Sequence, residues 1–508
     1  GKRASLARRE LPRIVDALER YVDAPLPLAK LDVAAVPEFF GAMENPGLVT
    51  FAAPALAGPG FEDIAAHELA HQWFGDSVTP AWWEHLWLSE AFASWLGEKV
   101  AGALTAPRSP LWAHSSRLGV LEADDEIDAR ALVHPIANPD EIEPAFDANA
   151  YDKGAAVLAM FERFVGPDAW KAAVRRYLTA HAGTSVTSQA FLDALARATR
   201  PEIAGALAEN LGHAGTPVVE LALRCGASPA VIASAGSGVT VPVCVRFPEA
   251  ATRTARRCFL AGARTEQPLP ACPAWLVGND GGLGYYRTVW LGAAPLAPLV
   301  ELSPEEIFAH GDDAAFAVRR GELPIRDALV ELTRLSATRD PYGELAALEI
   351  AGAIDGLVSD PVRPAWTAWL AGRFADRLTR AALLSPRSMV DHTLRREIVA
   401  LAADAIDPAI AAAARARIER RRDPFRDPVV LRVAAARDAG SVFDRLVRAA
   451  ADAPTEEARN EARNEARDET RDETRDETRD EVLEALGELP APLAPRIVDV
   501  LLDRRFPA

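Results

Sequence analysis

The chain has 508 residues, of which 49% are hydrophobic, so it is long enough to form several globular domains. Its formal net charge of −17 argues against a nucleic-acid partner, because the basic surface that phosphates require is missing. No apolar stretch reaches the length needed to cross a bilayer, so we expect no membrane span.

The first segment predicts a helix and then two strands. Residues 5–22 place apolar side chains at helical spacing, and residues 31–36 and 48–51 have strand character. Between the two strands lies the loop sequence Gly-Ala-Met-Glu-Asn, which contains Glu44. A fixed carboxylate can pair with the cationic α-amine of a peptide, so Glu44 is a candidate substrate anchor. The alternative is a solvated loop glutamate.

The most informative stretch follows these strands. Residues 61–74 contain neither glycine nor proline and predict a helix. His67 and His71 are four residues apart, so both rings lie on one helix face and can bind one zinc ion. Glu68 lies beside them, close enough to act as general base on a metal-bound water. The alternative interpretation treats both histidines as core residues.

A third metal ligand is expected from the next helix, which is predicted over 83–101. Glu90 lies there, and eighteen residues separate it from His71. A catalytic zinc keeps three protein ligands and an open position for water, so Glu90 is the natural third ligand. If the histidines are core residues, Glu90 is a solvated side chain.

Further along the chain, a helix is predicted to begin near Tyr151, and helical patterns continue from 155 to about 210. A tyrosine at the start of a helix is by itself more often a packing residue than a catalytic one. His134 lies in the preceding acidic segment, and we expect it to have a structural role.

From 217 to about 292 the pattern changes to short β-branched or alternating runs, which predict a small β-sandwich. All four cysteines lie in this segment, at positions 225, 244, 258 and 272. Their even number and close spacing favour two disulfides and an oxidising compartment, with three pairings open. The alternative is four free thiols in a cytoplasmic protein.

The remainder of the chain predicts helix pairs of an α-solenoid type. Within it, residues 456–481 repeat arginine and acidic residues with no apolar face, so we expect a solvated helix or a disordered loop rather than a binding motif. The predicted fold class is therefore multidomain α+β. The expected domains are a catalytic domain over 1–213, a β-sandwich over 214–295 and a helical domain over 296–508.

Three motifs together resemble the aminopeptidase N family of zinc metallopeptidases, in the gluzincin clan. They are GAMEN at 41–45, HELAHQWFG at 67–75 and LWLSEAFASWL at 86–96. The spacing from His71 to Glu90 also matches that of the family. In addition, Tyr151 begins a Tyr-x-Lys-Gly sequence that the family shares. The resemblance implies a thermolysin-like, mostly helical catalytic domain.

The resemblance also implies a role for each candidate residue. It implies that His67, His71 and Glu90 bind zinc. It implies that Glu68 is the general base and that Tyr151 stabilises the tetrahedral intermediate. The residues implied to bind the substrate are Glu44, Gly41, Ala42 and Phe40. Together with Phe40, Met43 suggests an apolar lining of the pocket for the first side chain. The preferred first residue is not evident from these residues.

Three positions depart from the family pattern. Ser89 and Ala91 flank Glu90 where asparagine and glycine are usual, and Asp76 replaces an asparagine. None of these changes removes a ligand, but they can alter the hydrogen bonds that orient the ligands. The family also begins with an N-terminal β-domain, whereas only about forty residues precede GAMEN here. We therefore expect the chain to lack that domain, with weaker anchoring of the substrate amine.

The predicted function is a zinc-dependent aminopeptidase, with one Zn²⁺ per chain, that acts on peptides with free N-termini. Two alternatives stay open: an inactive scaffold of the same fold, and a related zinc hydrolase such as an endopeptidase or an epoxide hydrolase. We expect a monomer. The clustered cysteines favour an extracytoplasmic location over a cytoplasmic one.

Overall fold

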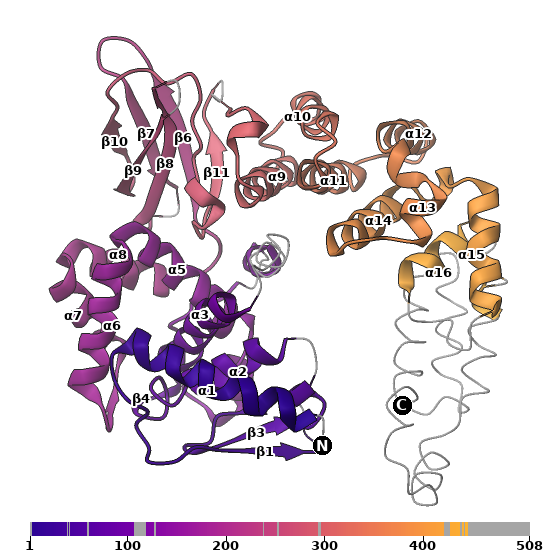
Figure 1. The fold of residues 1–508 in the computed structure, drawn as a ribbon. Helices are drawn as coiled ribbons and strands as arrows, with labels where there is room; N and C mark the ends of the chain where they lie inside the picture. The colour runs from indigo at the N-terminus through magenta and orange to yellow at the C-terminus, as the bar shows by residue number, and fades with distance from the viewer. Residues whose placement is uncertain are drawn as a thin grey trace, which may run out of the picture. The chain divides into compact units, whose positions relative to one another are not determined.

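The computed structural model describes residues 3–37, 39, 41–57, 60–105, 118–125, 129–236, 238–250, 253–292, 296–420, 427–436, 439–440 and 442–444. These residues belong to two compact units, Gly1–Asp313 and Ala314–Ala508. Helices and small sheets occur together, which confirms a mixed α+β protein (Figure 1). The predicted domain boundaries near 213 and 295 stay predictions. The charged repeat over 456–481 lies outside the described residues.

The first unit begins with a helix and a small sheet. These elements are α1 (Arg3–Val22), β1 (Asp32–Val36), β2 (Ala42–Met43) and β3 (Leu48–Ala52). The predicted helix and both predicted strands are therefore confirmed. Strand β3 lies in the middle of the sheet, parallel to β1 and antiparallel to β2. The short strand β2 belongs to the GAMEN sequence and forms an edge of the sheet.

Two packed helices follow, α2 (Phe61–Ala70) and α3 (Trp87–Leu104). The prediction that the first helix runs to residue 74 was wrong, because it ends at Ala70 and His71 is its C-cap. The reason is a tightened last turn, in which the amides of Gln72 and Trp73 donate to carbonyls three residues back. The second helix starts later than predicted, after a short 3₁₀ turn over Trp83–His85.

Further helices complete the helical part of this unit. A π-helical turn, η5 (Asn149–Lys153), leads into α5 (Gly154–Val165), which contacts α3. The remaining elements are α6 (Pro167–His181), β5 (Thr184–Val186), α7 (Ser188–Ala198) and α8 (Pro201–Leu211), with β5 parallel to β4 (Val78–Pro80).

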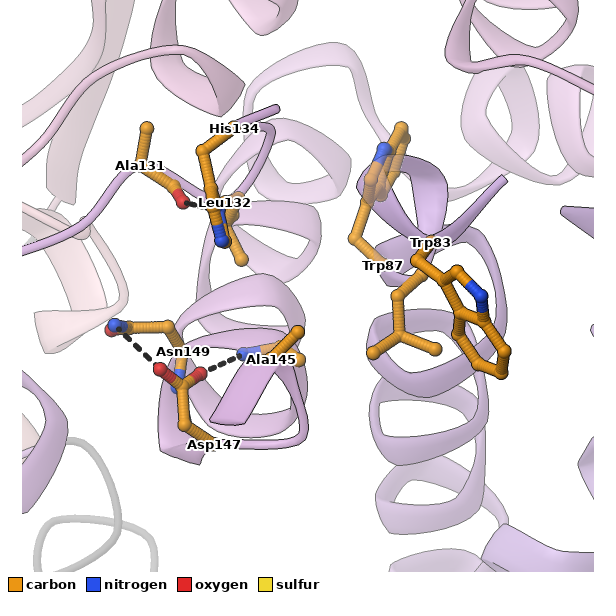
Figure 2. A pocket seen from close by; sticks show the side chains of 10 residues that line it. Trp83, Trp87, Ala131, Leu132, His134, Ala145, Asp147 and Asn149 are labelled. Atoms are coloured by element: carbon orange, nitrogen blue, oxygen red, sulfur yellow. Dashed lines mark hydrogen bonds between the residues drawn. The ribbon is translucent and has the colours of Figure 1, made fainter. Parts of the chain in front are cut away.

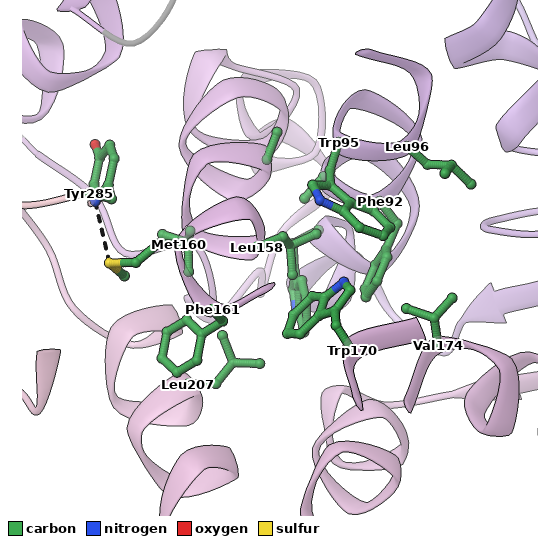
Figure 3. Packing of buried hydrophobic residues seen from close by; sticks show 14 of the residues in the cluster. Phe92, Trp95, Leu96, Leu158, Met160, Phe161, Trp170, Val174, Leu207 and Tyr285 are labelled. Atoms are coloured by element: carbon green, nitrogen blue, oxygen red, sulfur yellow. Dashed lines mark hydrogen bonds between the residues drawn. The ribbon is translucent and has the colours of Figure 1, made fainter. Parts of the chain in front are cut away.

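Aromatic side chains form the core around α3 (Figure 3). The ring centroid of Phe92 lies 4.8 Å from that of Phe74 and 4.7 Å from that of Phe191. One helical turn further, Trp95 meets Trp170 edge to face at 5.9 Å. Such pairs bury large apolar areas in specific geometries. They therefore fix the orientation of the helix that carries Glu90.

A β-rich segment, defined here as residues 218–290, follows α8. Its strands are β6 (Val218–Arg224), β7 (Ala230–Ala235), β8 (Val241–Ala250), β9 (Arg253–Ala261), β10 (Thr265–Pro268) and β11 (Arg287–Trp290). The four-stranded sheet has the order β10-β7-β6-β11, and β8 pairs antiparallel with β9. The predicted strand content is confirmed, whereas the sandwich assignment stays a prediction.

Both expected disulfides are present in the β-rich segment. One joins Cys225 to Cys272, and the other joins Cys244 to Cys258 across the β8–β9 pair. This result resolves the choice between disulfides and free thiols, and it selects one of the three pairings.

The described residues of the second unit form helices, in agreement with the predicted helical C-terminal part. Helix α9 (Pro304–Arg319) crosses the division between the units. The others are α10 (Ile325–Ala337), α11 (Pro341–Asp355), α12 (Arg363–Arg373), α13 (Arg380–Leu384), α14 (Met389–Ala402), α15 (Pro408–Arg420) and α16 (Pro428–Ala435). Within the described ranges, none of the helices combines the length and hydropathy that crossing a bilayer demands.

Candidate metal centre and active site

Three side chains from α2 and α3 converge on one point. The Nε2 atoms of His67 and His71 are 3.0 Å apart, and Glu90 Oε2 lies 3.6 Å and 3.4 Å from them. All three can offer one ligand atom to the same ion. A tetrahedral zinc with bonds of about 2.0–2.1 Å separates its ligand atoms by roughly 3.3–3.4 Å. The donor types and their spacing therefore fit a zinc ion.

Close contact between the two helices creates this convergence. Gly97 of α3 lies against the backbone of α2, so that a Cβ atom there would be 2.8 Å from the amide nitrogen of His67. Only a glycine lets the two backbones approach this closely. Two turns earlier on α3, Glu90 faces the histidines, and its side chain is buried with that of His71.

Hydrogen bonds orient both imidazole rings. His71 Nδ1 lies 3.0 Å from the Phe74 carbonyl and 3.0 Å from Ser89 Oγ. His67 Nδ1 lies 3.3 Å from Ser94 Oγ. When Nδ1 donates its proton to such partners, the Nε2 lone pair remains available for a metal. Ser89, one of the departures from the family pattern, thus contributes to the support of His71.

Burial and the hydrogen bonds between Glu90 and the two histidines act in opposite directions on the pKa values of these three side chains. Burial alone would raise the pKa of Glu90, but hydrogen bonds with His67 and His71 outweigh it and lower the pKa to about 2. Burial lowers the pKa of His67. Burial opposes a charge on His71 too, but the hydrogen bond and the charge of Glu90 outweigh it and raise its pKa to about 9. An ion at this site would therefore compete with a proton for His71.

Glu68 lies next to these ligands and is buried. Burial raises its pKa to about 7, and the charges of Glu44 and Glu90 act in the same direction. A carboxyl group with a pKa near neutrality can take up a proton and later release it. Burial likewise raises the pKa of Asp76, which also departs from the family pattern, to about 7.

Tyr151 lies beside His67, with its ring stacked on the imidazole at a centroid distance of 5.9 Å. It belongs to the π-helical turn η5, a geometry that is frequent at functional sites. Burial, followed by the charges of Glu90 and Glu44, raises its pKa. The phenol therefore keeps its proton at neutral pH and can donate a hydrogen bond.

The GAMEN segment lies beside the metal centre. Gly41 is exposed with a φ of +71°, Ala42 is half-buried, and Met43 is exposed. The charge of Glu44 acts on His67, Glu68, His71 and Tyr151. Phe40 lies outside the described residues.

Gln72 is a site residue that the sequence did not reveal. Its buried side chain accepts a hydrogen bond from the Gly47 amide at 3.0 Å and donates one to the Glu44 carbonyl at 2.9 Å. The residue after His71 therefore holds both sides of the loop that carries Glu44. Its position directly after the HExxH motif was the available signal, but both partners are at least 25 residues away in sequence.

A small pocket lies next to η5, lined among others by Trp83, Trp87 and His134 (Figure 2). His134 donates from Nδ1 to the Ala131 carbonyl at 2.9 Å. Asp147 accepts hydrogen bonds from the backbone amides of the turn that follows it. These contacts are local, in line with a structural role for His134.

Comparison with known proteins identifies this part of the chain. Residues 7–209 match the family model described as the peptidase family M1 domain. They form a domain of the aminopeptidase N family, peptidase family M1. This region contains every residue of the candidate site.

Three relatives show the extent of the similarity to this M1 domain. A probable aminopeptidase 1 from Sulfurisphaera tokodaii is 32% identical over 43% of this chain and 29% of its own length. Aminopeptidase M1-B from Oryza sativa is 38% identical over 34% of this chain and 21% of its own length. Human endoplasmic reticulum aminopeptidase 1 is 35% identical over 36% of this chain and 21% of its own length. The chain thus spans less than a third of the length of these relatives.

Proposed function

We propose that this chain is a zinc-dependent aminopeptidase that removes the N-terminal residue from peptides. The observation that supports it most directly is the convergence of His67, His71 and Glu90, with Glu68 and Tyr151 around them. When bound, zinc lowers the pKa of water towards neutrality and polarises the scissile carbonyl. The M1 domain and the aminopeptidase names of its relatives agree with this assignment.

Glu68 is the proposed general base. A pKa near 7 suits a carboxylate that takes the proton of the attacking water and passes it to the leaving amine. Tyr151 is the proposed electrophilic partner, since its protonated phenol can donate to the oxyanion that develops on the scissile carbonyl.

The proposed restriction to free N-termini depends on the GAMEN segment. Glu44 would pair with the substrate α-amine, and Gln72 would hold the loop that presents this carboxylate. Strand β2 is an edge strand, so the backbone at Gly41 and Ala42 can pair with an extended peptide. Phe40 and Met43 are the proposed lining for the first side chain of the substrate.

We also propose the finer architecture and setting of the chain. The proposed domains are a thermolysin-like catalytic domain over 1–213, a small β-sandwich over 214–295 and a solenoid-like helical domain over 296–508. The two disulfides favour an oxidising, extracytoplasmic setting. We propose a monomer that binds one zinc ion.

Replacement of the base tests the mechanism. Glu68→Ala should retain one zinc per chain, because it leaves all three ligands in place, but should lose nearly all turnover of an aminoacyl amide. Glu62→Ala is the matched control, since Glu62 belongs to the first turn of the same helix. Zinc content and initial rates are measured for both. Wild-type activity in Glu68→Ala would show that another group is the base.

A further inference from the structure

The turn that carries Tyr151 ends at Lys153, which forms a buried ion pair with Asp124. The side chain of Lys153 is 2% exposed and that of Asp124 is fully buried, and Lys153 Nζ lies 2.8 Å from Asp124 Oδ2. The same ammonium group donates to the carbonyls of Arg130 and His213, both at 3.2 Å. Buried lysines are rare unless they are paired, so this arrangement is a specific feature of the fold.

The β-rich segment completes this ion pair. Tyr285 donates its hydroxyl proton to Asp124 Oδ2 at 3.1 Å, and its backbone amide lies 3.3 Å from Met160 Sδ on α5 (Figure 3). The next residue, Asp125, forms a second ion pair, in which its Oδ2 lies 2.8 Å from Nη2 of Arg287 on β11. The adjacent residues Asp124 and Asp125 thus connect the part of the chain before η5 to the β-rich segment.

The ion pair is close to Tyr151 in sequence and structure. Lys153 is the last residue of η5, two positions after Tyr151. The next residue, Gly154, lies against α3, where an added Cβ would be 2.3 Å from the Cβ of Ala91, the neighbour of Glu90. The turn is therefore held by α3 on one side and by Lys153 on the other. Loss of the Lys153 anchor would let the turn relax and move the phenol.

We propose that Lys153 is a positioning residue for Tyr151, and that the Asp124–Tyr285 hydrogen bond makes the placement of the phenol depend on the β-rich segment. The inference rests on the role of Tyr151 in the proposed function. Buried ion pairs contribute little net stability but can specify one geometry. Here the specified geometry is that of an oxyanion donor, for which a small displacement has a large effect on rate.

Removal of one hydroxyl group tests the connection. Tyr285→Phe loses the hydrogen bond to Asp124, whereas the control Tyr286→Phe loses a hydrogen bond to the Gly278 carbonyl at 3.1 Å within the β-rich segment. Both tyrosines are buried. We expect Tyr285→Phe to lower kcat by about tenfold with unchanged KM and zinc content, and Tyr286→Phe to change kcat less than about twofold. Equal effects of the two variants would overturn the proposal.

A double-mutant cycle separates positioning from a general structural effect. In a Tyr151→Phe background, Tyr285→Phe should cause no further loss of kcat, because the group that it positions is gone. A structural effect would lower kcat by the same factor in both backgrounds and would overturn the proposal. The double variant Lys153→Met/Asp124→Asn removes both charges without leaving either one unpaired, and it should behave as Tyr285→Phe does.

Hydrogen exchange provides a readout that does not depend on turnover. Backbone amides of 149–153 should exchange faster in Tyr285→Phe than in wild type, and at the wild-type rate in Tyr286→Phe. If the wild-type chain hydrolyses no aminoacyl amide, the proposed function fails, while the exchange rates still decide whether Tyr285 holds the turn. Unchanged exchange at 149–153 in Tyr285→Phe would overturn the inference.

Discussion

A methyl group at Gly97 tests how closely the two helices of the metal centre must approach. In Gly97→Ala the new Cβ would lie 2.8 Å from the amide nitrogen of His67 and 3.0 Å from its Cα. Backbone atoms cannot rotate away, so α2 and α3 must separate by about 0.5 Å or more to restore ordinary contact. Such overpacking costs about 1–3 kcal/mol. The better helix propensity of alanine offsets about 1 kcal/mol of that cost.

The separation of α2 from α3 acts directly on the ligand set. His67 and His71 belong to α2 and its C-cap, whereas Glu90 belongs to α3. We expect Gly97→Ala to weaken zinc binding by at least about tenfold, which corresponds to about 1.4 kcal/mol. Competition with a chromogenic chelator measures the affinity, and thermal unfolding of the zinc-free chain measures the stability.

Gly102→Ala is the matched control on the same helix. Apart from its chain neighbours and the backbone of its own helix, a Cβ at Gly102 would meet no atom of the described residues within 4 Å. This variant should keep wild-type zinc affinity and gain about 1 kcal/mol of stability from helix propensity. If Gly97→Ala shows wild-type zinc affinity and the same gain in stability as Gly102→Ala, then the close approach of α2 and α3 does not set the metal geometry.

Three further substitutions test the surroundings of the metal. Glu44→Ala should reduce the preference for free over N-acetylated aminoacyl amides, and an unchanged ratio of initial rates would exclude Glu44 as the amine anchor. Gln72→Leu removes both hydrogen bonds to the GAMEN loop, so KM for free-amine substrates should rise while zinc content stays constant; an unaltered KM would contradict this role. Ser89→Ala should lower zinc affinity by about tenfold in chelator competition, and retention of full affinity would show that Phe74 alone orients His71.

The pairing of His67 with His71 in the candidate metal centre could be predicted from the sequence because it is local, whereas the approach of Glu90 depends on the packing of α3 against α2. Two histidines four residues apart share a helix face whatever the rest of the fold does. The helical and β-rich segments were also predictable, since their periodicities extend over many residues. The prediction that the first metal-binding helix continues to residue 74 was wrong, because the 3₁₀ turn after Ala70 left no periodic signal.

Features that depend on distant partners could not be predicted. The position of Gln72 directly after the HExxH motif marks it as a neighbour of the site, but does not indicate that it holds a loop that begins 28 residues earlier at Glu44. Likewise, Lys153 and Asp124 are 29 residues apart, and their ion pair depends on the packing of α5 against neighbouring segments. From the sequence alone, Gly97 is only an unfavourable residue within a helix, because its contact with the backbone of His67 depends on how the two helices pack. Such contacts are properties of the tertiary structure.

The most direct test of the proposed activity is the hydrolysis of unblocked aminoacyl reporter amides by this chain, beside their N-acetyl counterparts, with and without a zinc chelator. A zinc aminopeptidase should hydrolyse only the free-amine substrates, and the chelator should abolish that turnover. Absence of turnover with one zinc still bound per chain would contradict the proposed activity and favour an inactive scaffold. Equal turnover of the acetylated substrates would instead indicate a different zinc hydrolase.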